Sequence, residues 1–184
     1  MEKVLGKFGF VPHPDFQHPD LMIGCKVSTS GAETLKFEYV VIGDIEQLAI
    51  PGPAPRQRTD GLWQHTCMEA FIMVGDGSYL ELNFSPSGQW ATYRFSDYRE
   101  GMAEASDIAL KPLAMGWQKS SMRFWLAAEV EVPELVPTNE CRLGLAAVIE
   151  ETDGSKSYWA LAHPPGKPDF HHPACFAATL PAPL

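Results

Sequence analysis

The sequence lacks the segments that would export the chain or hold it in a membrane. Residues Met1 to Gly6 contain no apolar stretch behind a basic start, and no stretch approaches membrane-spanning length. We therefore expect a cytoplasmic protein with no membrane partner.

The chain is also short of positive charge. It holds 14 Lys and Arg residues against 23 Asp and Glu residues, giving a formal net charge of -9 and a pI near 5.1. Affinity for nucleic acid depends largely on neutralising phosphates with basic side chains, so this balance argues against a nucleic-acid partner.

Closely spaced cysteines are missing as well. The four cysteines are far apart, at Cys25, Cys67, Cys141 and Cys175. No CxxC metal or redox motif is present, and a chain without an export signal is not expected to carry a disulfide framework. We expect free, mostly buried thiols.

No amphipathic run of helical period is long enough to cover a sheet, and strand-like runs do not alternate with helical ones. At 184 residues the chain fits one domain, residues 1–184. Short runs with strand character recur between turn signals, at 21–28, 35–42, 68–74, 79–84, 89–95, 108–113, 122–130, 141–150 and 157–161. This pattern predicts an all-β, antiparallel β-sandwich of immunoglobulin-like or jelly-roll-like type.

The segments between these runs have their own signatures. Proline breaks residues 10–16 into a lead-in strand or arm and makes 50–58 a surface loop. Residues 98–102 suit a short turn of helix. The tail 174–184, rich in Ala and Pro, is expected to fray after its strand.

Two neighbouring strands carry polar residues in alternation with apolar ones. Period two places Glu69 on one face with Cys67 and Phe71, and gives the next strand a polar face with Glu81 and Asn83. If the strands pair through a turn at 75–77, these polar groups share one concave surface. A solvated face with ordinary cross-strand pairs is the alternative.

A proline-rich loop near the C-terminus combines histidines with an aspartate. His163, Asp169 and His171 are residue types that bind metal ions, although their spacing matches no known zinc pattern. Hydrogen bonding within the loop is the competing interpretation. No G-x-S-x-G motif or evident nucleophile–base pair supports covalent catalysis.

Two tryptophans lie beside polar loops. Trp63 and Trp159 are placed so that an exposed indole would stack on the apolar face of a sugar while carboxylates and amides bind its hydroxyls.

Four blocks of the sequence, 62–71, 79–90, 98–102 and 157–171, resemble the bacterial DOMON-like domain family. That family is related to DOMON domains, which bind haem or sugar, and to type 9 carbohydrate-binding modules. The resemblance spans nearly the whole chain and implies an immunoglobulin-like β-sandwich.

The resemblance also implies roles for particular residues. Trp63 and Trp159 would clamp a terminal sugar, Glu69 would bind its hydroxyls, and Asn83 resembles an asparagine on the next polar strand. Where type 9 modules place an arginine, this sequence has Glu81, which inverts the charge at that point. The haem-binding branch uses a Met and His pair, and no Met or His here matches those positions.

The sequence thus predicts a non-catalytic domain that binds a small carbohydrate or sugar-derived metabolite in a tryptophan-lined cleft, without a cofactor. The predicted ligand-binding residues are Trp63, Glu69, Glu81, Asn83, Trp159, His163, Asp169 and His171. Three alternatives remain: a metal-binding domain or metal-dependent enzyme centred on His163, Asp169 and His171, a haem-binding domain, and an interaction domain with an aromatic face. The sequence leaves the oligomeric state open.

Overall fold

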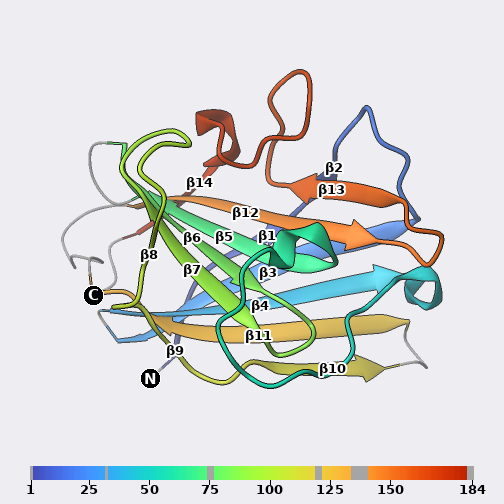
Figure 1. Cartoon of the computed structure of the whole chain (residues 1–184), viewed down its shortest axis with the longest axis horizontal. Helices are drawn as coiled ribbons and strands as arrows, with labels where there is room; N and C mark the ends of the chain where they lie inside the picture. Colours follow the sequence, from blue (N-terminus) through green and yellow to red (C-terminus); the bar gives the residue numbers. More distant parts are fainter. Residues whose placement is uncertain (1, 32, 74–76, 119–121, 134–140, 182–184) are drawn as a thin grey trace.

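Two antiparallel sheets pack face to face, which confirms the predicted all-β sandwich (Figure 1). The structure is a computed structural model and describes residues 2–31, 33–73, 77–118, 122–133 and 141–181. Helical structure in these ranges is limited to the short 3₁₀ turns η1 (Ile45–Gln47), η2 (Leu62–Gln64) and η4 (Pro173–Cys175). Within the same ranges, no helix has the length and apolar character needed to cross a membrane.

The first sheet has the strand order β1-β3-β4-β11-β10, with β9 pairing with β11. Its strands are β1 (Lys3–Gly9), β3 (Leu21–Gly31), β4 (Thr34–Gly43), β9 (Ala109–Leu110), β10 (Ala114–Gln118) and β11 (Arg123–Glu131).

The second sheet has the order β2-β13-β12-β5-β6-β7-β8, with β14 pairing with β12. Its strands are β2 (Val11–Pro12), β5 (Cys67–Met73), β6 (Tyr79–Phe84), β7 (Trp90–Phe95), β8 (Ala103–Glu104), β12 (Cys141–Glu150), β13 (Lys156–Ala160) and β14 (Ala178–Leu180). We refer to this sheet as the site sheet.

The central strands of the site sheet are buried on both faces. On β5, Met68, Ala70 and Ile72 enter the core between the sheets, while Cys67 and Phe71 point to the outer face. The outer face is covered by a second apolar cluster, in which Phe170 and Phe176 come from the C-terminal segment. The predicted separation of β5 into two faces is confirmed, and the solvated alternative is wrong for this face.

Several sequence-based boundaries need correction. Residues 97–100 form a tight turn with an antiparallel bridge between Asp97 and Glu100, instead of the helical turn expected at 98–102. The run at 108–113 forms a strand only at β9, and β1 and β10 were not predicted. The turn predicted at 75–77 falls largely on residues outside the described ranges.

The C-terminal tail pairs with the site sheet through β14. Strand β14 pairs antiparallel with β12, with Cys141 opposite Leu180 and Leu143 opposite Ala178. Leu180 is 2% exposed, so its burial holds the tail down to that point. Residues 182–184 lie outside the described ranges. The four cysteines are free, and three of them are buried, as expected.

Trp159 is part of the core. Its indole is 2% exposed and its Nε1 donates a hydrogen bond to Ser157 Oγ at 2.9 Å. On β12 the residue opposite it is Ala147, whose small side chain leaves room for the ring. The predicted clamp of Trp63 and Trp159 is therefore wrong, because a sealed indole cannot stack on a ligand.

Replacing Trp159 should cost stability because it removes a large buried side chain. Trp159→Ala is expected to lower the free energy of unfolding by about 3–5 kcal/mol, measured by urea denaturation. The matched control is Trp117→Ala, since Trp117 is 47% exposed at the edge of the other sheet and should cost less than half as much. Equal losses for the two variants would contradict the core assignment.

Candidate ligand-binding pocket

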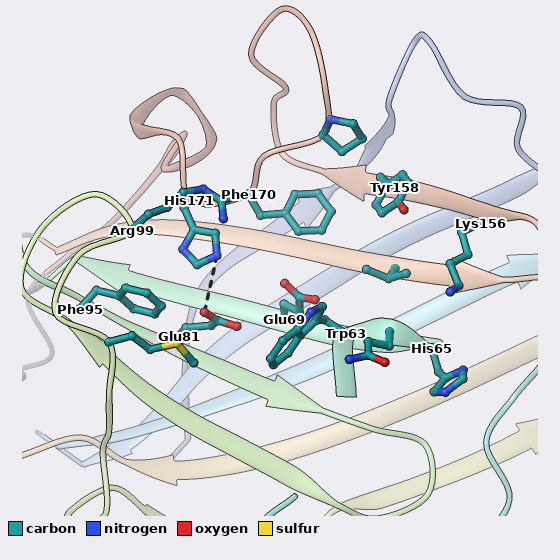
Figure 2. A pocket seen from close by; sticks show the side chains of 14 residues that line it. Trp63, His65, Glu69, Glu81, Phe95, Arg99, Lys156, Tyr158, Phe170 and His171 are labelled. Atoms are coloured by element: carbon teal, nitrogen blue, oxygen red, sulfur yellow. Dashed lines mark ion pairs between the residues drawn. The ribbon is translucent and has the colours of Figure 1, made fainter. Parts of the chain in front are cut away.

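A pocket of about 640 Å³ lies on the outer face of the site sheet (Figure 2). Its base is formed by β5 and β6, and its walls come from η2, β13, the end of β7, the turn that follows β7 and the loop before η4. Of the eight predicted site residues, four line it: Trp63, Glu69, Glu81 and His171.

Two carboxylates form the base of the pocket. In the pairing of β5 with β6, Glu69 lies opposite Asn83, and Glu81 lies opposite Phe71. Glu69 and Glu81 are therefore diagonal neighbours on one face, a separation that long side chains can bridge. Figure 2 shows both carboxylates between Trp63 and His171. The predicted shared surface of Glu69, Glu81 and Asn83 is confirmed.

Glu81 is surrounded by hydrogen-bond donors. Asn83 Nδ2 donates to Glu81 Oε1 at 2.7 Å, and His171 Nε2 lies 3.7 Å from Glu81 Oε2. Asn83 has no exposed surface, so it supports Glu81 from behind and does not face a ligand. Burial raises the pKa of Glu81, and the hydrogen bond from Asn83 and the charge of Arg99 partly offset this effect.

Glu69 has fewer donors around it. Only 3% of the residue is exposed, and its Oε1 has no hydrogen-bond partner. Burial, together with the negative charge of Glu81, raises the pKa of Glu69 well above its ordinary value. A buried carboxyl oxygen without a donor costs free energy, and a bound ligand can supply the missing donor.

His171 is fixed in orientation by a short chain of hydrogen bonds. The backbone N–H of Arg99 donates to the Tyr79 hydroxyl at 3.2 Å, and the Tyr79 oxygen lies 2.8 Å from His171 Nδ1. The Tyr79 hydroxyl can donate to Nδ1, and in that tautomer the Nε2 atom, 3.7 Å from Glu81 Oε2, carries the proton. Burial, and next the nearby charge of Arg99, lowers the pKa of His171 to about 4, so the ring is neutral at pH 7.

The loop that carries His171 is attached to the turn after β7 by one ion pair. Asp169 Oδ1 accepts hydrogen bonds from Arg99 Nη2 at 2.7 Å and Nε at 3.2 Å, and its Oδ2 accepts one from the Tyr98 hydroxyl. Although partial burial opposes it, these contacts lower the pKa of Asp169. Arg99 adopts a left-handed backbone conformation with φ of 56°, uncommon for a residue other than glycine. Asp169 therefore supports the wall of the pocket without lining it.

Trp63 stands at the mouth. It lies on η2, which follows Gly61 with φ of 76°, and the buried Leu62 anchors this turn. Trp63 is 38% exposed, and its ring contacts that of Tyr93 in an edge-to-face arrangement with ring centroids 6.1 Å apart. The exposed part of the indole is available to a ligand in the same pocket as the two carboxylates.

The predicted metal triad is not brought together. The Nε2 atom of His163 lies 3.0 Å from the backbone oxygen of Val11, and Asp169 is paired with Arg99, whereas His171 faces Glu81. In the part of the chain that the structure describes, no group of three His, Cys, Asp or Glu side chains is arranged to hold a metal ion. His163 and Asp169 are held mainly by residues outside the loop, Val11 and Arg99, and the alternative of hydrogen bonding within the loop applies to the bond from His171 N–H to Asp169 Oδ1.

Sequence reasoning missed several residues of the walls. These are chiefly Phe95, Arg99, Lys156, Tyr158 and Phe170. For Tyr158 a signal was present, because alternation on β13 places it on the face opposite Trp159. Tyr158 pairs with Val148, which also lines the pocket. Tyr158 is thus the aromatic residue that β13 contributes to this face.

Both the sequence and the fold of this chain can be compared with those of known proteins. At the level of sequence, no family model and no curated protein matches this chain. Solved structures do match. A protein from Bacteroides uniformis, described as a candidate carbohydrate-binding protein, is 14% identical with a TM-score of 0.59, over 93% of this chain and 84% of that one.

A second match is a family 9 carbohydrate-binding module from Caldicellulosiruptor kristjanssonii in complex with cellotriose. It is 9% identical with a TM-score of 0.51, over 88% of this chain and 75% of the module. The chain shares the fold of these two proteins. At such low identity the likeness extends to the fold alone, and the resemblance to DOMON-like domains stays a prediction.

The buried carboxyl of Glu69 should make stability depend on pH. The folded protein holds the Glu69 proton to a higher pH than the unfolded chain does, so this group lowers the free energy of unfolding as pH rises above about 4.5. Glu69→Gln, which mimics the neutral carboxyl, should flatten that fall. Urea denaturation from pH 4 to 8 measures both curves.

His171 changes the free energy of unfolding in the opposite direction. Because its pKa is lowered in the folded protein, stability is lost as pH falls from 6.5 toward about 4. This contribution is present in both proteins, so the difference between wild type and variant reports the titration of Glu69 together with its interaction with Glu81. Glu129→Gln, at a partly exposed carboxylate paired with Lys111 on the other sheet, is the control. Parallel curves for wild type and Glu69→Gln would show that burial does not perturb Glu69.

Proposed function

We propose that this domain binds a small carbohydrate, without catalysis, in the pocket over β5 and β6. One observation carries the proposal: a buried acceptor without a donor, Glu69 Oε1, lines the same pocket as the partly exposed indole of Trp63. These two features would bind different parts of a sugar.

A sugar ring presents hydroxyl donors at its rim and C–H groups on its face. A hydroxyl directed at Glu69 Oε1 would supply the missing hydrogen bond, whose absence costs about 1–3 kcal/mol for a buried polar group. The ring face would meanwhile stack on the indole of Trp63. Phe95, Tyr158 and Phe170 give the remaining walls an aromatic character.

The size and depth of the pocket support the same proposal. A volume of about 640 Å³ falls in the range of small-molecule sites, which span roughly 300–1,000 Å³. Such sites combine mostly apolar walls with a few convergent polar groups, as Glu69, Glu81 and His171 do here.

The fold adds support at a coarser level. One structure with this fold is a module in complex with cellotriose. The tryptophan-lined cleft expected from the sequence is revised, because Trp159 is sealed in the core and Tyr158 is the aromatic residue of β13 that lines the pocket.

The test is a calorimetric titration of the protein with a panel of mono- and disaccharides, with tryptophan fluorescence as a second signal. For a sugar that binds, Trp63→Ala should weaken affinity about tenfold or more, since a partly buried aromatic contact at a binding site contributes about 2 kcal/mol. Trp117→Ala is the matched control and should leave affinity unchanged, because Trp117 belongs to the other sheet.

A flat response across the panel would overturn the proposal, as would equal affinity in wild type and Trp63→Ala. The absence of catalysis is checked separately by mass spectrometry of the bound sugar after long incubation. Recovery of intact sugar is the expected result, and accumulation of a hydrolysed product would contradict a purely binding role.

A further inference from the structure

The charges around the pocket are unbalanced at its base. Two carboxylates, Glu69 and Glu81, converge there from adjacent strands, both at most 5% exposed. Carboxylates buried this deeply are usually paired with a cation or bound by several donors. The basic groups nearby therefore decide what the base of the pocket can accept.

These basic groups compensate the carboxylates only in part, since the charge of Arg99 lowers the pKa of Glu81 but does not offset the effect of its burial. Arg99 is held by Asp169 at 2.7 Å, and His171 is neutral at pH 7 because burial lowers its pKa to about 4. Lys156 lines the pocket on the side of Tyr158 and His65, away from the two carboxylates (Figure 2).

Hydrogen-bond donors are also unequally shared between the two carboxylates. Glu81 Oε1 accepts a hydrogen bond from Asn83 Nδ2 at 2.7 Å, and Glu81 Oε2 lies 3.7 Å from His171 Nε2. In contrast, Glu69 Oε1 has no partner. The open position is thus on the Glu69 side, next to Trp63. A ligand group that fills it meets two buried acid groups at once.

We propose that this position receives a protonated primary amine, so that the preferred ligand is a sugar with a free amino group. This inference rests on the proposed function and adds the charge of the ligand. An ammonium group has three N–H donors, enough for both Glu69 and Glu81, and its positive charge favours the ionised form of these two carboxyl groups, which burial disfavours.

The walls suit a cation as well. The indole of Trp63 and the rings of Phe95 and Tyr158 line the pocket around the carboxylates, and aromatic faces attract ammonium groups. A neutral hydroxyl at the same position would complete a hydrogen bond without balancing the charge. Hydrogen bonds to charged partners are the stronger class, so an amine should be preferred over a hydroxyl by about tenfold.

The experiment compares three sugars that differ at one substituent: glucosamine, glucose and N-acetylglucosamine. Each is titrated calorimetrically at pH 7 into wild type, Glu69→Gln, Glu81→Gln and the control Glu129→Gln. Wild type and Glu129→Gln should bind glucosamine about tenfold more tightly than either neutral sugar. In Glu69→Gln and Glu81→Gln the ratio of glucosamine affinity to glucose affinity should fall toward one, whatever change each substitution makes in the affinity for glucose itself.

The outcomes separate this inference from the proposed function. Equal binding of glucosamine and glucose by wild type would overturn the amine preference and leave carbohydrate binding intact. Binding of none of the three, together with a flat response across the wider panel, would overturn both. A preference that persists in both glutamine variants would also overturn the inference, because the carboxylates would then not be its source.

A fourth probe, cyclohexylamine, separates amine binding from sugar binding. Affinity well below that of glucosamine is expected, because it lacks hydroxyls for the other polar groups of the pocket. Equal affinity would overturn the claim that the preferred ligand is a sugar. Thermal denaturation of each variant verifies folding, and Glu69→Gln should fold because glutamine matches a neutral carboxyl in shape.

Discussion

The alternation of side chains along β5 and β6 is the constraint on which the rest of the structure depends. Their inner faces, with residues such as Met68 and Leu82, are buried against the other sheet. Because side chains alternate with period two, this burial forces Glu69 and Glu81 together onto the outer face. A sheet face with two carboxylates among aromatic rings is stable only when it is covered and its polar groups are supported.

The covering is supplied by segments distant in sequence. The loop before η4 brings Phe170 and His171 over β5 and β6, and the ion pair between Asp169 and Arg99 ties this loop to the turn after β7. The same arrangement gives Glu81 a hydrogen bond from Asn83 and places His171 3.7 Å away, but it leaves Glu69 without a donor on Oε1. In this pocket the cost of burying Glu69 is not fully offset by hydrogen bonds, a situation that is common at binding sites.

The shared fold and the chemistry of the pocket are two separate kinds of support for the proposed function. The structural matches concern the arrangement of strands, at 14% and 9% identity. The proposal of sugar binding rests on Trp63 and Glu69, and the preference for an amine rests on the convergence of two buried carboxyl groups, Glu69 and Glu81. Each step adds an independent physical requirement to the same pocket.

The sequence by itself determined the all-β sandwich, most strand positions and the common face of Glu69, Glu81 and Asn83, because these follow from local alternation and turn residues. It did not determine β1, β10 or β14, whose short or glycine-containing segments form strands by pairing with neighbours. Nor did it decide between Trp159 and Tyr158, two adjacent aromatics of which one must face each side. Only tertiary packing, with Ala147 opposite Trp159, placed one ring in the core and left the other for the pocket.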